Sequence, residues 1–233
     1  MLATLWGDVR AAKDRDPAAR SALTIMICYP GLHAIWGHRA SGWLWHHRAR
    51  LLARASSELT RVLTGVDIHP AATLAPGVFI DHATGVVIGE TAQVGTDVTI
   101  YHGVTLGGTS LDKGKRHPTI GDRVIIGAGA KILGPVTIGD DSRIGANAVV
   151  TKPVPPGSVV VGVPGQVIAP SHPRPTTALP RREDIQLPDL VGTSLQSLLT
   201  RVDKLESQID GRAASPTVRP PEAGVWHGED FAI

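Results

Sequence analysis

The stretch of sequence that decides the fold reads IGDRVIIGAGAKILGPVTIGDDSRIGANAVV, residues 120–150. An aliphatic residue recurs at every sixth position of this stretch, and the same period, with two breaks, continues back to Ile68. The members of the series are Ile68, Leu74, Ile80, Ile88, Val94, Ile100, Leu106, Ile120, Ile126, Ile132, Ile138, Ile144 and Val150. A period of six fits neither an α-helix nor an alternating strand, and it is the hexapeptide signature of a parallel β-helix.

The period also predicts the dimensions of the fold. Each hexapeptide forms one side and three sides close a coil of eighteen residues, so residues 65–168 should form about five coils of a left-handed parallel β-helix. Glycine follows the aliphatic residue in seven of the thirteen cases. We expect the glycines at the corners of the coils, where a positive φ favours a residue without Cβ. Pro153, Pro155 and Pro156 should end the array, because proline cannot donate a ladder hydrogen bond.

Residues 1–64 lack the period of six and show helical spacing instead. We expect an all-α domain in which Asp16 and Pro17 are the N-cap and first residue of a helix, and in which Pro30-Gly31 is a break. Since only the two ends of a β-helix need capping, this domain could cover the first coil.

The C-terminal part, residues 169–233, shows neither pattern throughout. Residues 169–192 are a proline-rich linker, and residues 194–209 carry an apolar stripe with the 3-4 spacing of a short helix. The remaining residues have the composition of a flexible tail.

Composition limits the function. The net charge of +2 gives no footprint of nucleic-acid or membrane binding. The apolar run at 22–27 is too short to span a bilayer, and no signal peptide is evident. The single cysteine, Cys28, excludes an internal disulfide and fits a reducing compartment. We therefore expect a cytoplasmic protein.

The first break in the period separates Ile80 from Ile88 by eight residues and contains Asp81 and His82. Histidine is the side chain best suited to move protons near neutral pH, and a carboxylate on one ring nitrogen makes the other a better base. Either Asp81 or Asp67 could serve, since Asp67 lies fifteen residues earlier, three short of a coil. A turn aspartate and a surface histidine are the alternative that spacing leaves open.

The second break separates Leu106 from Ile120 by fourteen residues and contains a basic loop that includes Arg116 and His117. The guanidinium group of an arginine can donate two parallel hydrogen bonds to one carboxylate. The alternative is a solvent-exposed loop whose charges have no binding role. Together with His82 and His102, His117 also raises the question of a three-histidine zinc site. We expect no metal, because the separations are twenty and fifteen and no acid-rich second shell is evident.

Several motifs together resemble the bacterial serine O-acetyltransferase family. They are DRDPA at 14–18, PGLHA at 30–34, GVDIHP at 65–70, IDHATG at 80–85, GETA at 89–92, VTLGGT at 104–109, KRHP at 115–118, GAGAKILG at 127–134 and VGVP at 161–164. The resemblance covers roughly residues 8–168. The hexapeptide pattern is shared by many acyltransferases, whereas the DRDPA, IDHATG and KRHP motifs are much more specific in combination.

The resemblance implies transfer of an acetyl group from acetyl-CoA to the L-serine hydroxyl, the first step of L-cysteine biosynthesis from serine. By the same resemblance, His82 is the general base and Asp67 its orienting carboxylate. The substrate serine would be bound by Asp16, Asp81, Arg116 and His117. A base that takes the hydroxyl proton during attack on the thioester fits this chemistry without an acyl-enzyme.

The resemblance further implies that CoA, the co-substrate, lies between two β-helices against Gly108, Thr109, Ala128 and Ala146. It implies a homotrimer, with a dimer of trimers left open, and L-cysteine as feedback inhibitor. Where the family commonly has a basic residue after the VPG segment, this chain has Gln166.

The last residue, Ile233, resembles the C-terminal isoleucine that the family inserts into the active site of O-acetylserine sulfhydrylase (cysteine synthase). Two other functions stay open at this point. One is acetyl transfer to a sugar or an antibiotic, against which DRDPA and Ile233 argue. The other is a scaffold without enzyme activity, against which His82 and Asp67 argue.

Overall fold

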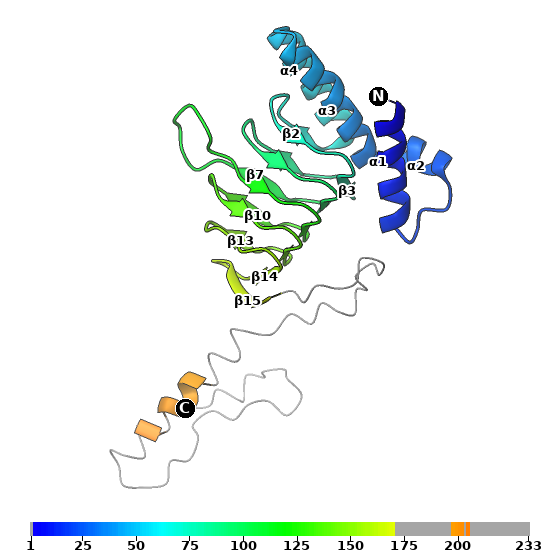
Figure 1. The fold of residues 1–233 in the computed structure, drawn as a ribbon. Coiled ribbons are helices and arrows are strands. Elements are labelled where there is room, and N and C mark those ends of the chain that lie inside the picture. The colour runs from blue at the N-terminus through cyan, green and yellow to red at the C-terminus, as the bar shows by residue number, and fades with distance from the viewer. Residues whose placement is uncertain (1, 171–196, 203, 206–233) are drawn as a thin grey trace. The chain divides into compact units, whose positions relative to one another are not determined.

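The computed structural model describes residues 2–170, 197–202 and 204–205. Four helices come first: α1 (Leu2–Arg15), α2 (Ala22–Cys28), α3 (Pro30–His46) and α4 (Arg50–Thr64). The strands that follow are short and wind into a parallel β-helix of about five coils, with the helices at one end (Figure 1).

Three sheets form the sides of the β-helix. Sheet 1 contains β1 (Asp67–Ile68), β4 (Val87–Ile88), β7 (Thr105–Gly107), β10 (Lys131–Leu133) and β13 (Val149–Val150). Sheet 2 contains β2 (Thr73–Leu74), β5 (Gln93–Val94), β8 (Thr119–Ile120) and β11 (Thr137–Ile138). Sheet 3 contains β3 (Phe79–Asp81), β6 (Thr99–Tyr101), β9 (Ile125–Ile126), β12 (Arg143–Ile144), β14 (Ser158–Val161) and β15 (Gln166–Pro170).

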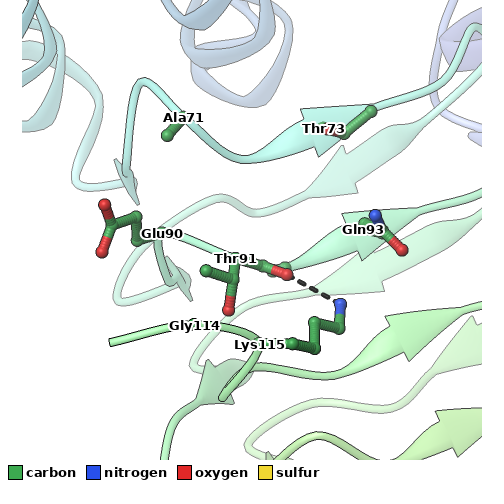
Figure 2. Close-up of a pocket in the computed structure, with 8 residues that line it drawn as sticks. Ala71, Thr73, Glu90, Thr91, Gln93, Gly114 and Lys115 are labelled. Carbon is green, nitrogen blue, oxygen red and sulfur yellow. Dashed lines mark hydrogen bonds between the residues drawn. The ribbon is translucent and has the colours of Figure 1, made fainter. Parts of the chain in front are cut away.

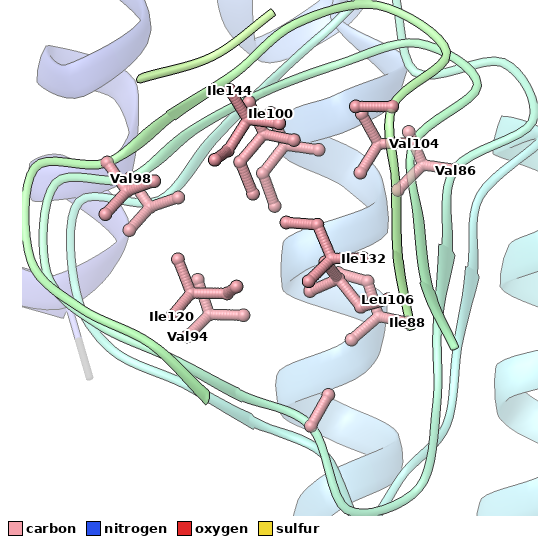
Figure 3. Close-up of a cluster of buried hydrophobic side chains, with 14 of the residues drawn as sticks. Val86, Ile88, Val94, Val98, Ile100, Val104, Leu106, Ile120, Ile132 and Ile144 are labelled. Atoms are coloured by element: carbon pink, nitrogen blue, oxygen red, sulfur yellow. The ribbon is translucent and has the colours of Figure 1, made fainter. Parts of the chain in front are cut away.

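The aliphatic series fills the interior of the coils, as the period predicts. Figure 3 looks down the axis of the β-helix and shows the side chains of successive coils stacked inside the triangle, for example Ile88, Leu106 and Ile132. These three are at most 1% exposed. Burial of a side chain of this size contributes about 1.5–3 kcal/mol, so the stacked series is the main source of stability for the β-helix.

The two breaks leave the register of the series intact. Ile68 lies beside Ile88, twenty residues on, and Val94 lies beside Ile120, twenty-six residues on. An undisturbed coil has eighteen residues, as between Ile126 and Ile144. The two extra residues of the first break and the eight of the second therefore form loops at the corners of the coil. The stacking of the aliphatic side chains inside the coil is unaffected.

The repeated glycines were expected to be required for a positive φ, and this reason is wrong. None of the glycines that directly follow a series residue has a positive φ, whereas Gly65, Gly77 and Gly85 at the corners do. The repeated glycines are needed because neighbouring coils approach closely. A Cβ on Gly95 would lie 2.7 Å from the carbonyl carbon of Gly121, and one on Gly127 would lie 2.7 Å from the amide nitrogen of Ala146.

The prolines at 153, 155 and 156 do not end the array, contrary to expectation. Val154, between them, still donates its amide proton to the carbonyl of Thr137 over 2.9 Å, and β14 pairs in parallel with β12. The ladder hydrogen bond of this segment is donated by Val154, so the prolines on either side of it do not interrupt the pairing. The array ends with β15, which runs antiparallel to β14.

The prediction that a helix begins at Asp16-Pro17 is also wrong. Residues 16–18 form a turn, and α2 begins at Ala22 with Ser21 as N-cap, whose hydroxyl accepts from the amide of Thr24 over 3.1 Å. The carboxylate of Asp16 has other partners, described below. Pro30 does mark a boundary, because it is the first residue of α3.

The helical region packs directly on the first coil, as expected of a cap. A Cβ on Gly31, in the first turn of α3, would lie 2.9 Å from the carbonyl carbon of Ile80. In the C-terminal part, residues 197–202 and 204–205 are helical, within the range predicted for a helix. The remaining positions of that prediction, and Ile233, lie outside the described residues. No described helix is long and apolar enough to cross a membrane.

Replacing Gly31 by alanine should weaken the packing of α3 on the first coil. The added methyl group meets backbone, which cannot rotate away, so we expect a loss of about 1–3 kcal/mol in the free energy of unfolding. Gly7→Ala is the matched control, because Gly7 in α1 has nothing within 4 Å of a new Cβ. This helical substitution should gain about 0.5–1 kcal/mol. Urea unfolding at one fixed protein concentration measures both, and equal midpoints would contradict the close packing.

Candidate active site

His82 sits on a strained turn between sheet 3 and sheet 1, here called the His82 corner. The turn follows β3, and His82 and Ala83 have φ values of 57° and 48°. Two consecutive non-glycine residues in this region are uncommon and cost free energy. Ala83 is fully buried, whereas the side chain of His82 is 75% exposed. The two-residue insertion therefore places an imidazole outside the coil.

The His82 corner continues along the axis of the β-helix. The ring of His82 meets the ring of His102 edge-on, with 5.9 Å between centroids. Both residues lie two positions after paired members of the aliphatic series, and on the next two coils the same place is taken by Ala128 and Ala146. Two imidazoles thus lie in line with two small side chains, which leave the backbone accessible.

The N-terminal helices bring Asp16 to the same side of the β-helix. Asp16 accepts hydrogen bonds from the hydroxyl of Tyr29 and, over 2.7 Å, from the amide of Ala18. Burial, the hydrogen bond to Asp16 and the charges of Asp16 and Asp81 raise the pKa of Tyr29 to about 12. Asp81 therefore acts on Tyr29 through its charge, whereas Asp16 is hydrogen-bonded to it, and Nε2 of His82 is 3.9 Å from Asp81 Oδ1.

Arg15 fixes the segment that carries Asp16. Its guanidinium donates to the carbonyl of Gly77 and to Asp97 Oδ1, each over 2.8 Å. Neither Arg15 nor Tyr29 was assigned a role from the sequence. The DRDPA motif contains Arg15, whereas nothing in the sequence singled out Tyr29.

Asp67, the predicted partner of His82, reaches the same corner from β1. Asp67 pairs with Val87, and the amide of Gly85 donates to the carbonyl of Gly65 over 2.9 Å, so the two segments are neighbours. Within the described residues, no hydrogen bond or ion pair joins the Asp67 carboxylate to the His82 ring. The structure therefore brings Asp81 and His82 together and ties Asp16 to Tyr29. The Asp67–His82 pair stays a prediction.

Arg116 and His117 lie at a different corner, between sheet 1 and sheet 2, here called the Arg116 corner. Arg116 donates to Glu90, and this hydrogen bond holds the pKa of the Glu90 carboxyl below its usual range. His117 is buried against Thr91. Glu90 and Thr91 belong to the GETA motif, but their contacts with the loop could not be read from it.

Lys115 closes the loop on its outer side. Its ammonium donates to the carbonyl of Thr91 over 2.7 Å, the contact dashed in Figure 2. An open groove of about 390 Å³ lies beside it. The groove is lined by Ala71, Thr73, Glu90, Thr91, Ala92, Gln93, Gly114 and Lys115, and none of the predicted site residues lines it.

The residues predicted to contact CoA divide between the two corners. Ala128 and Ala146 are at the His82 corner, whereas Gly108 and Thr109 follow β7 at the Arg116 corner. A Cβ on Gly108 would lie 3.3 Å from Nε2 of His117. Small residues at both places suit a thin pantetheine chain that approaches the backbone.

The three histidines of the zinc hypothesis are divided in the same way, because His82 and His102 are at one corner and His117 at the other. In the part of the chain that the structure describes, no group of three or more His, Cys, Asp or Glu side chains is arranged to hold a metal ion.

Comparison with known proteins identifies the family. Residues 117–152 match the family model for bacterial transferase hexapeptide repeats. The chain is 67% identical, over all 233 residues and the whole length of both chains, to a serine acetyltransferase of Mycobacterium tuberculosis.

Solved structures agree. A serine acetyltransferase of Neisseria gonorrhoeae in complex with serine matches with a TM-score of 0.70 and 45% identity, covering 72% of this chain and 69% of that one. A serine acetyltransferase of Brucella abortus in complex with coenzyme A matches with a TM-score of 0.72 and 44% identity, covering 73% of this chain and 68% of that one. A serine acetyltransferase in complex with cysteine matches with 0.71 and 42%, covering 72% and 70%.

These matches confirm the predicted fold class, a helical N-terminal region followed by a left-handed parallel β-helix. They also confirm the resemblance stated from the motifs. The chain belongs to the serine acetyltransferase family.

Proposed function

We propose that the protein transfers the acetyl group of acetyl-CoA to the hydroxyl of L-serine, giving O-acetyl-L-serine and CoA, the first step of L-cysteine biosynthesis. The observation that carries the proposal is the 67% identity, over the full length of both chains, to a serine acetyltransferase. The two loops that interrupt the period add the chemical groups this reaction needs, an exposed imidazole and a basic clamp.

His82 is the proposed general base. It takes the proton of the serine hydroxyl as the oxygen attacks the acetyl carbonyl of the thioester, and it gives this proton to the CoA sulfur as the C–S bond breaks. The acetyl group thus passes directly to serine, and CoA leaves as the thiol. Its exposed side chain can reach a substrate from outside the coil. Asp67 is the proposed orienting carboxylate, which would have to come within hydrogen-bond distance of the ring.

The substrate's two charged groups call for opposite partners. Asp16 and Asp81 would bind the serine ammonium, and Arg116 and His117 its carboxylate. These pairs occupy two different corners of one chain, and a free amino acid is too small to span them. The proposed site therefore lies between neighbouring subunits of a trimer, where the His82 corner of one meets the Arg116 corner of the next.

The same arrangement provides for CoA. Backbone groups at Ala128 and Ala146 on one subunit and at Gly108 and Thr109 on its neighbour would line the pantetheine chain, as the match to a coenzyme A complex supports. L-cysteine, found in a related structure, is proposed as feedback inhibitor at the serine site. We also propose a cytoplasmic location, which suits the unpaired Cys28. A dimer of trimers is the larger assembly proposed.

The reaction is tested by thiol release from acetyl-CoA with L-serine, amino sugars and aminoglycosides as acceptors. We expect release with L-serine, and His82→Ala should lower kcat about 10²–10⁴-fold, the usual contribution of a general base. Size-exclusion chromatography should show the variant unchanged in size. Release with another acceptor but not with L-serine would contradict the function, and near-normal kcat in His82→Ala would remove the base.

The proposed contact with O-acetylserine sulfhydrylase depends on the C-terminal residue. A terminal carboxylate with one apolar side chain can imitate an amino-acid substrate. Deleting Ile233 should abolish binding to the sulfhydrylase and leave acetyl transfer unchanged, as measured by calorimetry and by thiol release. Val in its place should bind more weakly than Ile. If complex formation persists after the deletion, the assignment of Ile233 is wrong.

A further inference from the structure

We propose that Thr91 is a positioning residue that holds His117 as the neutral tautomer with its proton on Nε2, so that this nitrogen donates to the carboxylate of the substrate. The inference rests on the proposed function only in the identity of the ligand. The tautomer itself follows from hydrogen-bond geometry.

The first argument comes from the backbone. The amide nitrogen of Thr91 lies 3.2 Å from Nδ1 of His117 in a hydrogen bond. A backbone amide can only donate, so Nδ1 must accept and carries no proton.

The hydroxyl of Thr91 independently requires the same tautomer. Its oxygen accepts from the amides of Arg116 over 3.0 Å and of His117 over 3.1 Å, which occupies both lone pairs. The remaining hydroxyl proton points to Nδ1 of His117, 2.9 Å away. All hydrogen-bonding capacity of this hydroxyl is used, and Nδ1 again is the acceptor.

The proton of a neutral ring must then be on Nε2, which has no hydrogen-bond partner among the described residues and lies beside Gly108. The ring rests against Gly89, where a Cβ would overlap its Cδ2 and Nε2 atoms. Glycine at this position therefore makes room for the imidazole. Nε2 thus lies between Gly89 and Gly108, beside the backbone at which the substrates are proposed to bind.

The surrounding charges favour the neutral ring. Burial lowers the pKa of His117, with a further contribution from Arg116, against which Glu90 acts in the opposite direction. Lys115 adds a second positive charge. A proton on Nδ1 would also face two donors from Thr91. The corner thus places one neutral donor, Nε2 of His117, beside the cations Arg116 and Lys115.

Thr91→Val keeps the shape of the side chain and removes the hydroxyl. Contacts with the carboxylate are equal in the ground state and the transition state, so their loss should raise KM and leave kcat nearly unchanged. We expect KM for L-serine to rise about tenfold, the effect of losing one ordinary hydrogen bond. Thr91→Ser should restore it. An unchanged KM in Thr91→Val, or a loss confined to kcat, would overturn the positioning role of the Thr91 hydroxyl. The tautomer, which the backbone amide at position 91 still favours in this variant, is tested by the two experiments that follow.

A second pair of variants tests the tautomer even if Thr91→Val does not fold. The amide of glutamine reaches the place of Nε2, whereas that of asparagine reaches the place of Nδ1. His117→Gln should therefore keep a lower KM for L-serine than His117→Asn. Equal increases would overturn the tautomer but leave the carboxylate role, and no increase in either variant would refute that role instead.

Nitrogen-15 NMR of the histidine-labelled protein gives a reading that needs no substrate. The ring signals of His117, identified by their loss in His117→Gln, should show a protonated Nε2 and an unprotonated Nδ1 at neutral pH. A protonated Nδ1 would overturn the inference. Because this spectrum does not depend on acetyl transfer, failure of the proposed function and failure of the tautomer are distinguished.

Discussion

The fixed length of the coil is the constraint on which the rest of the structure depends. Aliphatic side chains from successive coils stack in the interior, and each must return to the same place every eighteen residues. An extra residue cannot be accommodated inside without breaking this register, so it leaves at a corner. The two residues added before Val87 and the eight added before Thr119 are therefore outside the coil, where they can meet a substrate.

The same constraint explains where the backbone is strained. At the His82 corner the inserted residues adopt positive φ, and the buried methyl group of Ala83 fixes the turn. At the Arg116 corner the loop returns to the coil through hydrogen bonds to Thr91. Each corner is thus held by contacts close to it, and at the Arg116 corner these come from Thr91 on the preceding coil.

The period of six was sufficient to predict the fold, because burial in this architecture repeats with so little variation. Local signals were less reliable. Asp16 had the pattern of an N-cap, but its carboxylate binds Tyr29, a contact between residues thirteen apart that no local rule contains. The repeated glycines were predicted for the wrong reason, since they are required by the close approach of the adjacent coil and not by a positive φ.

The candidate site was only partly accessible from sequence. The breaks drew attention to His82 and Arg116, and the motifs supplied the remaining residues. Tyr29, Glu90 and Thr91 were missed because their roles lie in contacts with distant segments. That the residues divide between two corners is evident only from the fold, and it is the reason that the site is proposed to need two subunits.

The most direct test of that claim is complementation between two inactive variants. His82→Ala and Arg116→Ala chains, each carrying a different affinity tag, would be produced together and the mixed trimers isolated through both tags. If the site is shared, every mixed trimer has one interface with both corners intact, so about a third of the wild-type kcat per subunit should return. Activity no higher than that of the separate variants would contradict a site between subunits.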